Sequence, residues 1–247
     1  MAALKRPDPH PAFAQVDHRP WPLPSGPWAW RQEWLDLAFL HFEADAQELR
    51  RLLPAGVELE LFEGKAWIGI VPFSMRGVTK RGWPAPSMVS DFPEINVRTY
   101  VSDGKKSGVW FLSLDAASHL AVQFARRFFH LPYFYAQIQA AGRRDTYSYS
   151  AKRGAHGFVA EYEAFEAAPS RPGTFAHWAT ERYCLYSADV AGRCFRAEIQ
   201  HVKWPLQRAQ VSIVTNTLAD VRLGAMHPAV LFSSRLDVVV WPLERIG

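Results

Sequence analysis

Apolar and polar residues alternate over short stretches along most of this 247-residue chain, and turn residues separate the stretches. A period of two predicts β-strands that bury one face. The stretches "VELELF" (57–62) and "KAWIGIVPF" (65–73) flank a Glu-Gly turn and predict a hairpin. A second hairpin is predicted where "EINVRTYV" (94–101) leads through "SDGKKSG" into "VWFLSLDA" (109–116). The first expectation is therefore a mainly β fold.

The second half of the chain continues this pattern, and a few segments are helical instead. Further strands are predicted within residues 134–142, 145–153, 157–165, 182–189, 194–202, 209–214 and 234–243. Asp45 and Thr174 can each cap a short helix, and residues 118–131 have helical spacing. Together these elements predict an α+β, mainly β fold. Its form would be a closed antiparallel β-barrel or sandwich with two or three short flanking helices.

Composition narrows the class of protein. Residues 1–28 hold seven of the 18 prolines and predict an extended arm, followed by a single β-barrel domain over 29–247. The net charge of +4, without a long basic run, argues against a nucleic-acid partner. No apolar run is long enough to span a membrane, and residues 1–20 lack a signal-peptide core. We therefore expect a cytoplasmic protein without a membrane partner.

Several polar residues lie within apolar stretches and are candidates for a site. Glu94, Asn96 and Arg98 share one strand face, which is either solvent-exposed or the lining of an interior cavity. Further candidates for ligand binding are Arg127 and His130 on the predicted helix, Glu181, and His201. A buried carboxylate and guanidinium could orient an anionic or carbonyl-bearing ligand. The alternative is an ion pair that braces two strands.

The chain lacks the common signatures of cofactor and metal sites. Its nine histidines show no H-x-x-x-H or H-E-x-x-H spacing, and no glycine-rich phosphate loop follows a strand. Cys184 and Cys194 are too few for a four-ligand zinc site, and each is expected to pack as a small hydrophobe. No metal and no cofactor are expected.

Six motifs in order carry a resemblance to a known family. They are "ELRRLLPAGVELELFEGKAWIGIVPFSMRGV" (48–78), "DFPEINVRTYV" (91–101), "GVWFLSLDA" (108–116), "ARRFFHLPY" (125–133), "ERYCLY" (181–186) and "HVKWPLQ" (201–207). The chain resembles the YqjF-like family of uncharacterised bacterial proteins over roughly residues 20–243. That family is grouped with the acetoacetate decarboxylase-like superfamily, so the resemblance implies a closed antiparallel β-barrel with flanking helices.

The resemblance also contains an informative departure. Decarboxylases of this superfamily form a Schiff base on a lysine that follows a proline. Aligning Pro132 with that proline places Tyr133 at the lysine position and Phe134 at the position of the second lysine. A phenol cannot form an imine, so covalent decarboxylation through this position is excluded. Glu94 aligns with the active-site glutamate of the decarboxylases. Because Tyr133 takes the position of the active-site lysine, the resemblance implies catalytic roles for both Glu94 and Tyr133.

Two functional hypotheses follow. In the first, the protein binds a keto acid or another carboxylate-like small molecule in a cavity, as a lyase- or isomerase-like enzyme without covalent catalysis. Glu94 would serve as base or orienter, Tyr133 as donor, and Arg98 or Arg127 as the anion clamp. In the second, the protein is a non-catalytic binding or interaction protein whose interior is filled by its own side chains. The sequence leaves the oligomeric state open.

Overall fold

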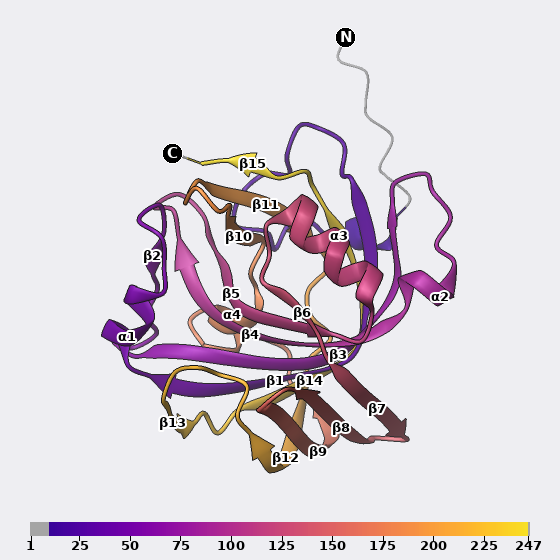
Figure 1. Cartoon of the computed structure of the whole chain (residues 1–247), viewed down its shortest axis with the longest axis vertical. Coiled ribbons are helices and arrows are strands. Elements are labelled where there is room, and N and C mark those ends of the chain that lie inside the picture. Colours follow the sequence, from indigo (N-terminus) through magenta and orange to yellow (C-terminus); the bar gives the residue numbers. More distant parts are fainter. Residues whose placement is uncertain (1–9, 247) are drawn as a thin grey trace.

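The chain folds mainly into β-strands, with a few short helices (Figure 1). The computed structural model describes residues 10–246. The strands in this range are β1 (Trp30–Ala44), β2 (Glu58–Leu59), β3 (Ala66–Lys80), β4 (Phe92–Ser102), β5 (Ser107–Ala116), β6 (Tyr133–Tyr135), β7 (Gln137–Arg143), β8 (Thr146–Arg153), β9 (His156–Ala167), β10 (Cys184–Ala188), β11 (Cys194–Gln200), β12 (Gln207–Asn216), β13 (Leu223–Met226), β14 (Val230–Val240) and β15 (Glu244–Arg245). This confirms the predicted mainly β class.

Seven strands form a ring. Neighbouring strands pair in the order β1, β3, β4, β5, β10, β11 and β14, and β14 pairs back with β1 from Trp30 opposite Val240 to Phe39 opposite Leu231. Antiparallel pairing was predicted throughout, but β5 pairs in parallel with both β6 and β10. A helix connects β5 to β6, and such a crossover brings the chain back in the same direction.

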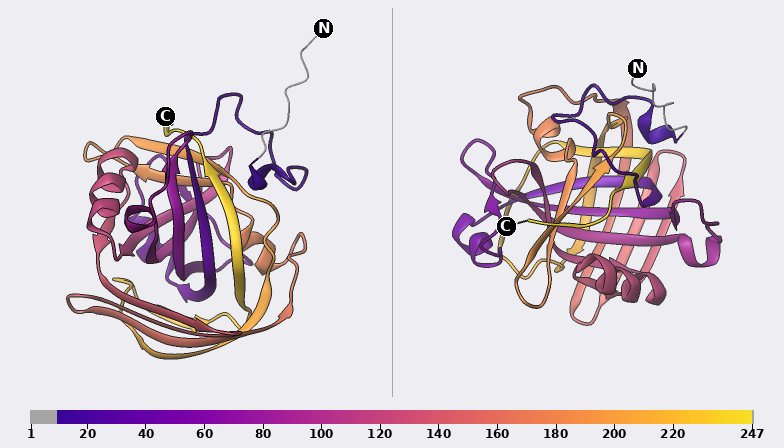
Figure 2. Two further views of the ribbon diagram at one scale, coloured as in Figure 1. Left: turned by 90° about the vertical axis from the view of Figure 1, so that its right-hand side faces the viewer. Right: turned by 90° about the horizontal axis from the view of Figure 1, so that it is seen from above.

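A second layer covers the outside of this ring. β12 continues from β14, and β9, β8 and β7 follow in order, forming the lower layer in the left-hand view of Figure 2. Ile95 and Val97 of β4 pack in one core cluster with Tyr149 and Phe158 of this layer. The apolar face of β4 therefore points to the outside of the ring, where the second layer covers it. Its polar face must point into the ring, because successive side chains of a strand alternate.

Three predicted helices are present with their caps. In α1 (Ala46–Arg51), the Asp45 carboxylate accepts from two backbone N–H groups at 2.8 Å each. Ser118 caps α3 (His119–Phe129), and Thr174 caps α4 (Phe175–Thr180). A short helix, α2 (Ser87–Ser90), was not predicted. None of the helices within the described residues has both the length and the apolar character that a membrane span requires.

The first predicted hairpin is wrong. A single bridge, between Phe62 and Lys65, joins the two segments. β2 instead pairs with the far end of β4, where Leu59 lies opposite Val101. The pairing of β3 with β4 ends at Thr99, so the edge of β4 beyond that point is open to β2.

The described part of the N-terminal segment packs on β11 and β14. It contains one turn of 3-10 helix (Pro11–Phe13), and the Gln200 side chain donates hydrogen bonds to two of its carbonyl groups. The Arg19 guanidinium forms a buried ion pair with Glu198 of β11. The first nine residues of the predicted arm lie outside the described residues. These contacts hold residues 17–19 close to the chain that follows β11.

Candidate functional site

A cavity of about 450 Å³ lies inside the ring and is closed on one side by α3. Most of its wall is apolar and aromatic, formed by residues such as Trp30, Trp34, Leu37, Val71, Phe73, Met75, Phe92, Phe111, Leu114, Phe124, Phe129 and Trp204. A few polar side chains interrupt this wall: Gln32, Glu94, Asn96, Arg98, Tyr133, Thr180, Arg182 and His201. An apolar cleft with a small number of convergent polar groups is the usual form of a small-molecule site.

Glu94 and Tyr133 meet at this cavity. The phenol of Tyr133 donates a hydrogen bond of 2.8 Å to Oε2 of the Glu94 carboxyl group, and Glu94 is 1% exposed. Burial raises the pKa of Glu94 to about 8; the hydrogen bond from Tyr133 opposes this shift, and the nearby Asp115 charge adds to it. Burial also raises the pKa of Tyr133 well above its usual value. At neutral pH both groups are mostly protonated.

Asn96 and Arg98 follow Glu94 along the same face of β4. The Asn96 side-chain oxygen is buried and accepts no hydrogen bond within the described residues. Arg98 donates through Nη2 to the Ala179 carbonyl at 3.3 Å, and its Nε has no partner there. No carboxylate in the described part of the chain forms an ion pair with Arg98. The guanidinium instead lies over the Phe39 and Tyr100 rings.

Arg182 and His201 add polar groups to another part of the wall. The charge of Arg182 is already paired with Glu60, and its Nε donates to the Trp178 carbonyl. Burial lowers the pKa of His201 to about 4, so its imidazole is neutral at physiological pH. These two groups shape the cavity without adding a free charge to it.

The structure separates the predicted site residues into two groups. Glu94, Asn96, Arg98, Tyr133 and His201 all line the cavity. Glu181 lies beside His201 instead of on the cavity wall. The predicted positions of Arg127 and His130 need correction. Arg127 is exposed on α3, the half-buried His130 follows the last residue of that helix, and neither lines the cavity.

The position of Arg127 and His130 has a local cause. The inner side of α3 is made of Ala121, Ala125 and Phe129, which leaves Arg127 exposed. The helix ends as His130 takes a left-handed conformation with φ of 51°, and its ring packs on Phe195 at 5.0 Å. The arginine pair in the aromatic stretch is thus the solvent side of the helix.

Sequence reasoning did not select Gln32, Trp34 or Thr180, which also line the cavity. The alternation of Trp30, Gln32 and Trp34 along β1 was an available signal, because all three share one strand face. Thr180 ends α4, and no local pattern marks it.

Groups capable of covalent attack are scarce in the cavity. No lysine within the described residues lines it. Cys184 lines it as a free thiol, and burial raises the pKa of that thiol, so it remains protonated.

A separate hollow of about 690 Å³ lies over β7, β8 and β9 and has no carboxylate side chain in its wall. The ring cavity is therefore the stronger candidate site.

Comparison with solved structures identifies the fold. Acetoacetate decarboxylase from Legionella pneumophila superposes with a TM-score of 0.65 at 15% identity, covering 94% of this chain and 93% of its own. The enduracididine biosynthesis enzyme MppR complexed with pyruvate gives 0.66 at 10% identity, covering 90% and 91%. An acetoacetate decarboxylase-like enzyme from Sphingomonas wittichii RW1 gives 0.62 at 12% identity, covering 95% and 99%. The chain therefore has an acetoacetate decarboxylase-like fold.

Sequence comparison identifies the family. The uncharacterized protein YqjF of Bacillus subtilis is 37% identical over 230 residues, which is 90% of this chain and 95% of that protein. Residues 31–237 match the model of the DUF2071 family, described as an uncharacterized conserved protein. These matches agree with the resemblance found in the motifs. The chain belongs to the DUF2071 family.

Proposed function

We propose that this protein binds small organic carboxylates, of the keto acid class, in the ring cavity. The observation that carries the proposal is the Arg98 guanidinium, which is buried at the cavity and has no carboxylate partner within the described residues. A buried cation without a counter-ion is costly, and a bound carboxylate would supply that counter-ion through charge-assisted hydrogen bonds. The unpartnered Arg98 Nε is one donor for such a bond.

The protonated Glu94–Tyr133 pair supports a second contact, to a carbonyl oxygen. A carboxylic acid kept neutral by its surroundings can donate a hydrogen bond. Glu94 and Arg98 are four residues apart on one strand, which corresponds to about 13 Å between Cα atoms. The Arg98 side chain shortens that span. A ligand with a carboxylate at one end and a carbonyl group toward the other fits this arrangement.

The volume and the relatives agree with the proposal. A cavity of about 450 Å³ lies within the usual range for small-molecule sites, which favours binding over an interior filled by the protein's own side chains. One structural neighbour is described as complexed with pyruvate. Because no lysine of residues 10–246 lines the cavity, the proposed binding involves no imine. Any turnover would rest on proton transfer by Glu94 and Tyr133.

Calorimetric titration with a panel of keto acids and aromatic acids tests the proposal. Arg98→Gln should weaken binding by about 10- to 100-fold, the value of one hydrogen bond to a charged group. The matched control is Arg208→Gln, which removes an exposed arginine paired with Glu166. Binding to the wild type should also weaken above pH 8, because ionised Glu94 repels a carboxylate.

Two results would contradict the proposal. One is the absence of binding by any acid in the panel to the wild type. The other is equal affinity of the wild type, Arg98→Gln and Arg208→Gln. If binding occurs, deuterium exchange next to the ligand carbonyl, followed by proton NMR, tests proton transfer. Glu94→Gln should abolish that exchange while the fold remains intact.

A further inference from the structure

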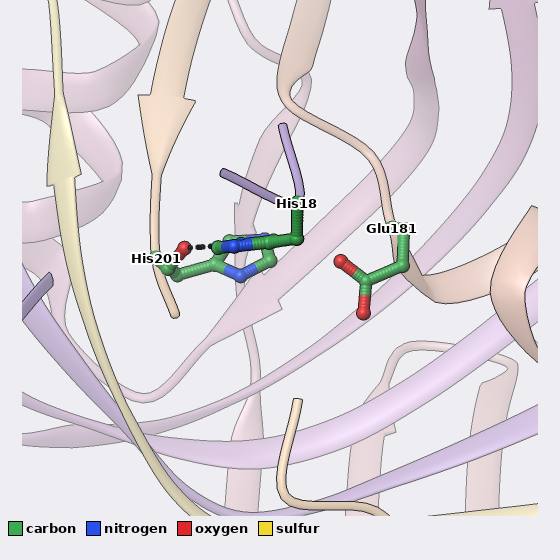
Figure 3. Close-up of side chains that lie close together, drawn as sticks. All are labelled: His18, Glu181 and His201. Atoms are coloured by element: carbon green, nitrogen blue, oxygen red, sulfur yellow. Dashed lines mark hydrogen bonds between the residues drawn. The ribbon is translucent and has the colours of Figure 1, made fainter. Parts of the chain in front are cut away.

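Three side chains from distant parts of the sequence converge beside the cavity. His18 belongs to the N-terminal segment, Glu181 follows α4, and His201 follows β11. One potential ligand atom from each lies within 4.8 Å of the other two. Figure 3 shows the Glu181 carboxylate facing the two imidazole rings. The side chain of His18 is 3% exposed and His201 is fully buried, whereas Glu181 is half-buried.

The hydrogen bonds of the two histidines define which nitrogen of each is available. His201 Nδ1 lies 2.7 Å from the Val202 carbonyl oxygen, and His18 Nε2 lies 3.1 Å from the His201 carbonyl oxygen. A carbonyl oxygen only accepts, so each of these nitrogens carries a proton. The other nitrogen of each ring, His18 Nδ1 or His201 Nε2, is the atom left to bind an ion. Both are buried without a hydrogen-bond partner within the described residues.

The carboxylate is held in a similar way. Tyr183 donates a hydrogen bond to Glu181, and the Ser170 hydroxyl donates another at 3.2 Å. The Tyr183 ring stacks on His201 at 4.7 Å and meets His18 edge-on at 5.7 Å. The positive charge of nearby Arg19 is paired with Glu198. Three potential ligand atoms thus converge, each on a side chain oriented by its other contacts, and no hydrogen bond joins these atoms to one another.

We propose that His18, Glu181 and His201 bind a divalent first-row transition metal ion such as Zn²⁺. Two imidazole nitrogens and one carboxylate are a donor set suited to such an ion, with a remaining position for water or another ligand. Histidine ligands in metal sites commonly donate their second nitrogen to a carbonyl group, as both do here. The site is separate from Glu94 and Tyr133 and was not expected from the histidine spacing.

The separation of the ligand atoms is compatible with binding after a small adjustment. Ligands about 2.1 Å from a tetrahedral ion lie about 3.4 Å from one another. Ligand atoms up to 4.8 Å apart must therefore close by about 1.4 Å. Rotation of the Glu181 side chain, with exchange of its Ser170 or Tyr183 hydrogen bond for the ion, and a small shift of His18 would provide this movement.

Titration of the purified, tag-free protein with Zn²⁺ and with Co²⁺ tests the proposal. The wild type should bind one equivalent of Zn²⁺, and bound Co²⁺ should give the visible absorption of a low-symmetry site with nitrogen ligands. His18→Gln and Glu181→Gln should each weaken Zn²⁺ binding by at least about 100-fold, beyond the loss typical of outer-shell changes. The matched control is His156→Gln, which alters a histidine that accompanies Asp220 at another site.

The variants remove partly buried groups, so circular dichroism and carboxylate binding in the ring cavity serve as checks of folding. A folded wild type that binds no stoichiometric Zn²⁺ would overturn the proposal. Equal Zn²⁺ affinity of the wild type and both folded ligand variants would also overturn it, because the ion would then bind elsewhere. Failure of carboxylate binding with intact Zn²⁺ binding would contradict only the proposed function of the ring cavity.

Discussion

The raised pKa of Glu94 predicts how the stability of this protein depends on pH. The carboxyl has a pKa of about 8 in the folded protein, against 4.5 as its ordinary value. Between these values the folded protein holds one more proton than the unfolded chain. The contribution of Glu94 is therefore complete below about pH 4.5 and is lost as the pH rises through about 8. One pKa unit corresponds to about 1.4 kcal/mol, so the contribution of Glu94 to the free energy of unfolding should fall by roughly 2–3 kcal/mol between pH 5 and pH 7.

Glu94→Gln isolates this effect. Glutamine has nearly the shape of the protonated acid but does not ionise, so the variant should lack this part of the pH dependence. At pH 5 the two proteins should have similar stability, and the variant should be more stable at pH 8. Urea unfolding can be followed by the fluorescence of the ten tryptophans at pH 5, 6, 7 and 8.

Comparison with a second variant controls for other titrating groups. Glu163→Gln makes the same change on an exposed part of β9 and should keep the wild-type dependence. Burial also raises the pKa of Asp115, so the wild-type curve alone contains more than one contribution. The difference between the wild type and Glu94→Gln is the decisive quantity. A difference that stays constant within about 0.5 kcal/mol from pH 5 to pH 8 would refute the neutral, buried Glu94.

Three further predictions follow from particular contacts. Tyr133→Phe removes the hydrogen bond that lowers the pKa of Glu94, so the pH-dependent loss of stability should extend to higher pH in the same urea assay; a shift to lower pH would contradict this. Gly108→Ala should lower the free energy of unfolding by about 1–3 kcal/mol in the urea assay, because the new Cβ would lie 2.5 Å from the Cys184 carbonyl oxygen. The control is Gly157→Ala, whose new Cβ would lie 3.6 Å from its nearest neighbour, so this variant should lose less stability. Borohydride reduction in the presence of pyruvate should leave the intact mass unchanged, and a stable adduct would show that a lysine reaches the ligand.

Local sequence patterns were sufficient to predict those elements whose stabilising contacts join residues close together in the sequence. The β4–β5 hairpin followed from alternation and a turn rich in polar residues, and the Asp45 cap lies within three residues of its partners. The other expected hairpin, over residues 57–73, failed although its alternation was as clear. β2 could pair with either β3 or β4, and the open end of β4 decided the outcome.

The candidate site was predictable only in part. Alternation placed Glu94, Asn96 and Arg98 on one face, and the resemblance added Tyr133. Helical spacing placed Arg127 and His130 on one stripe of α3, but it did not show which side of the helix faces the ring. The smaller residues Ala121 and Ala125 take the inner side.

The sequence by itself determined which residues can form strands, where helices begin, and that Tyr133 cannot form an imine. Only the tertiary structure decided that the polar face of β4 is buried, because burial depends on the pairing of β14 with β1 and on the layer outside the ring. It also decided that His18 meets His201, 183 positions further along the chain. Alternation assigns side chains to faces through local geometry, whereas the cover over each face comes from segments whose approach no local pattern specifies.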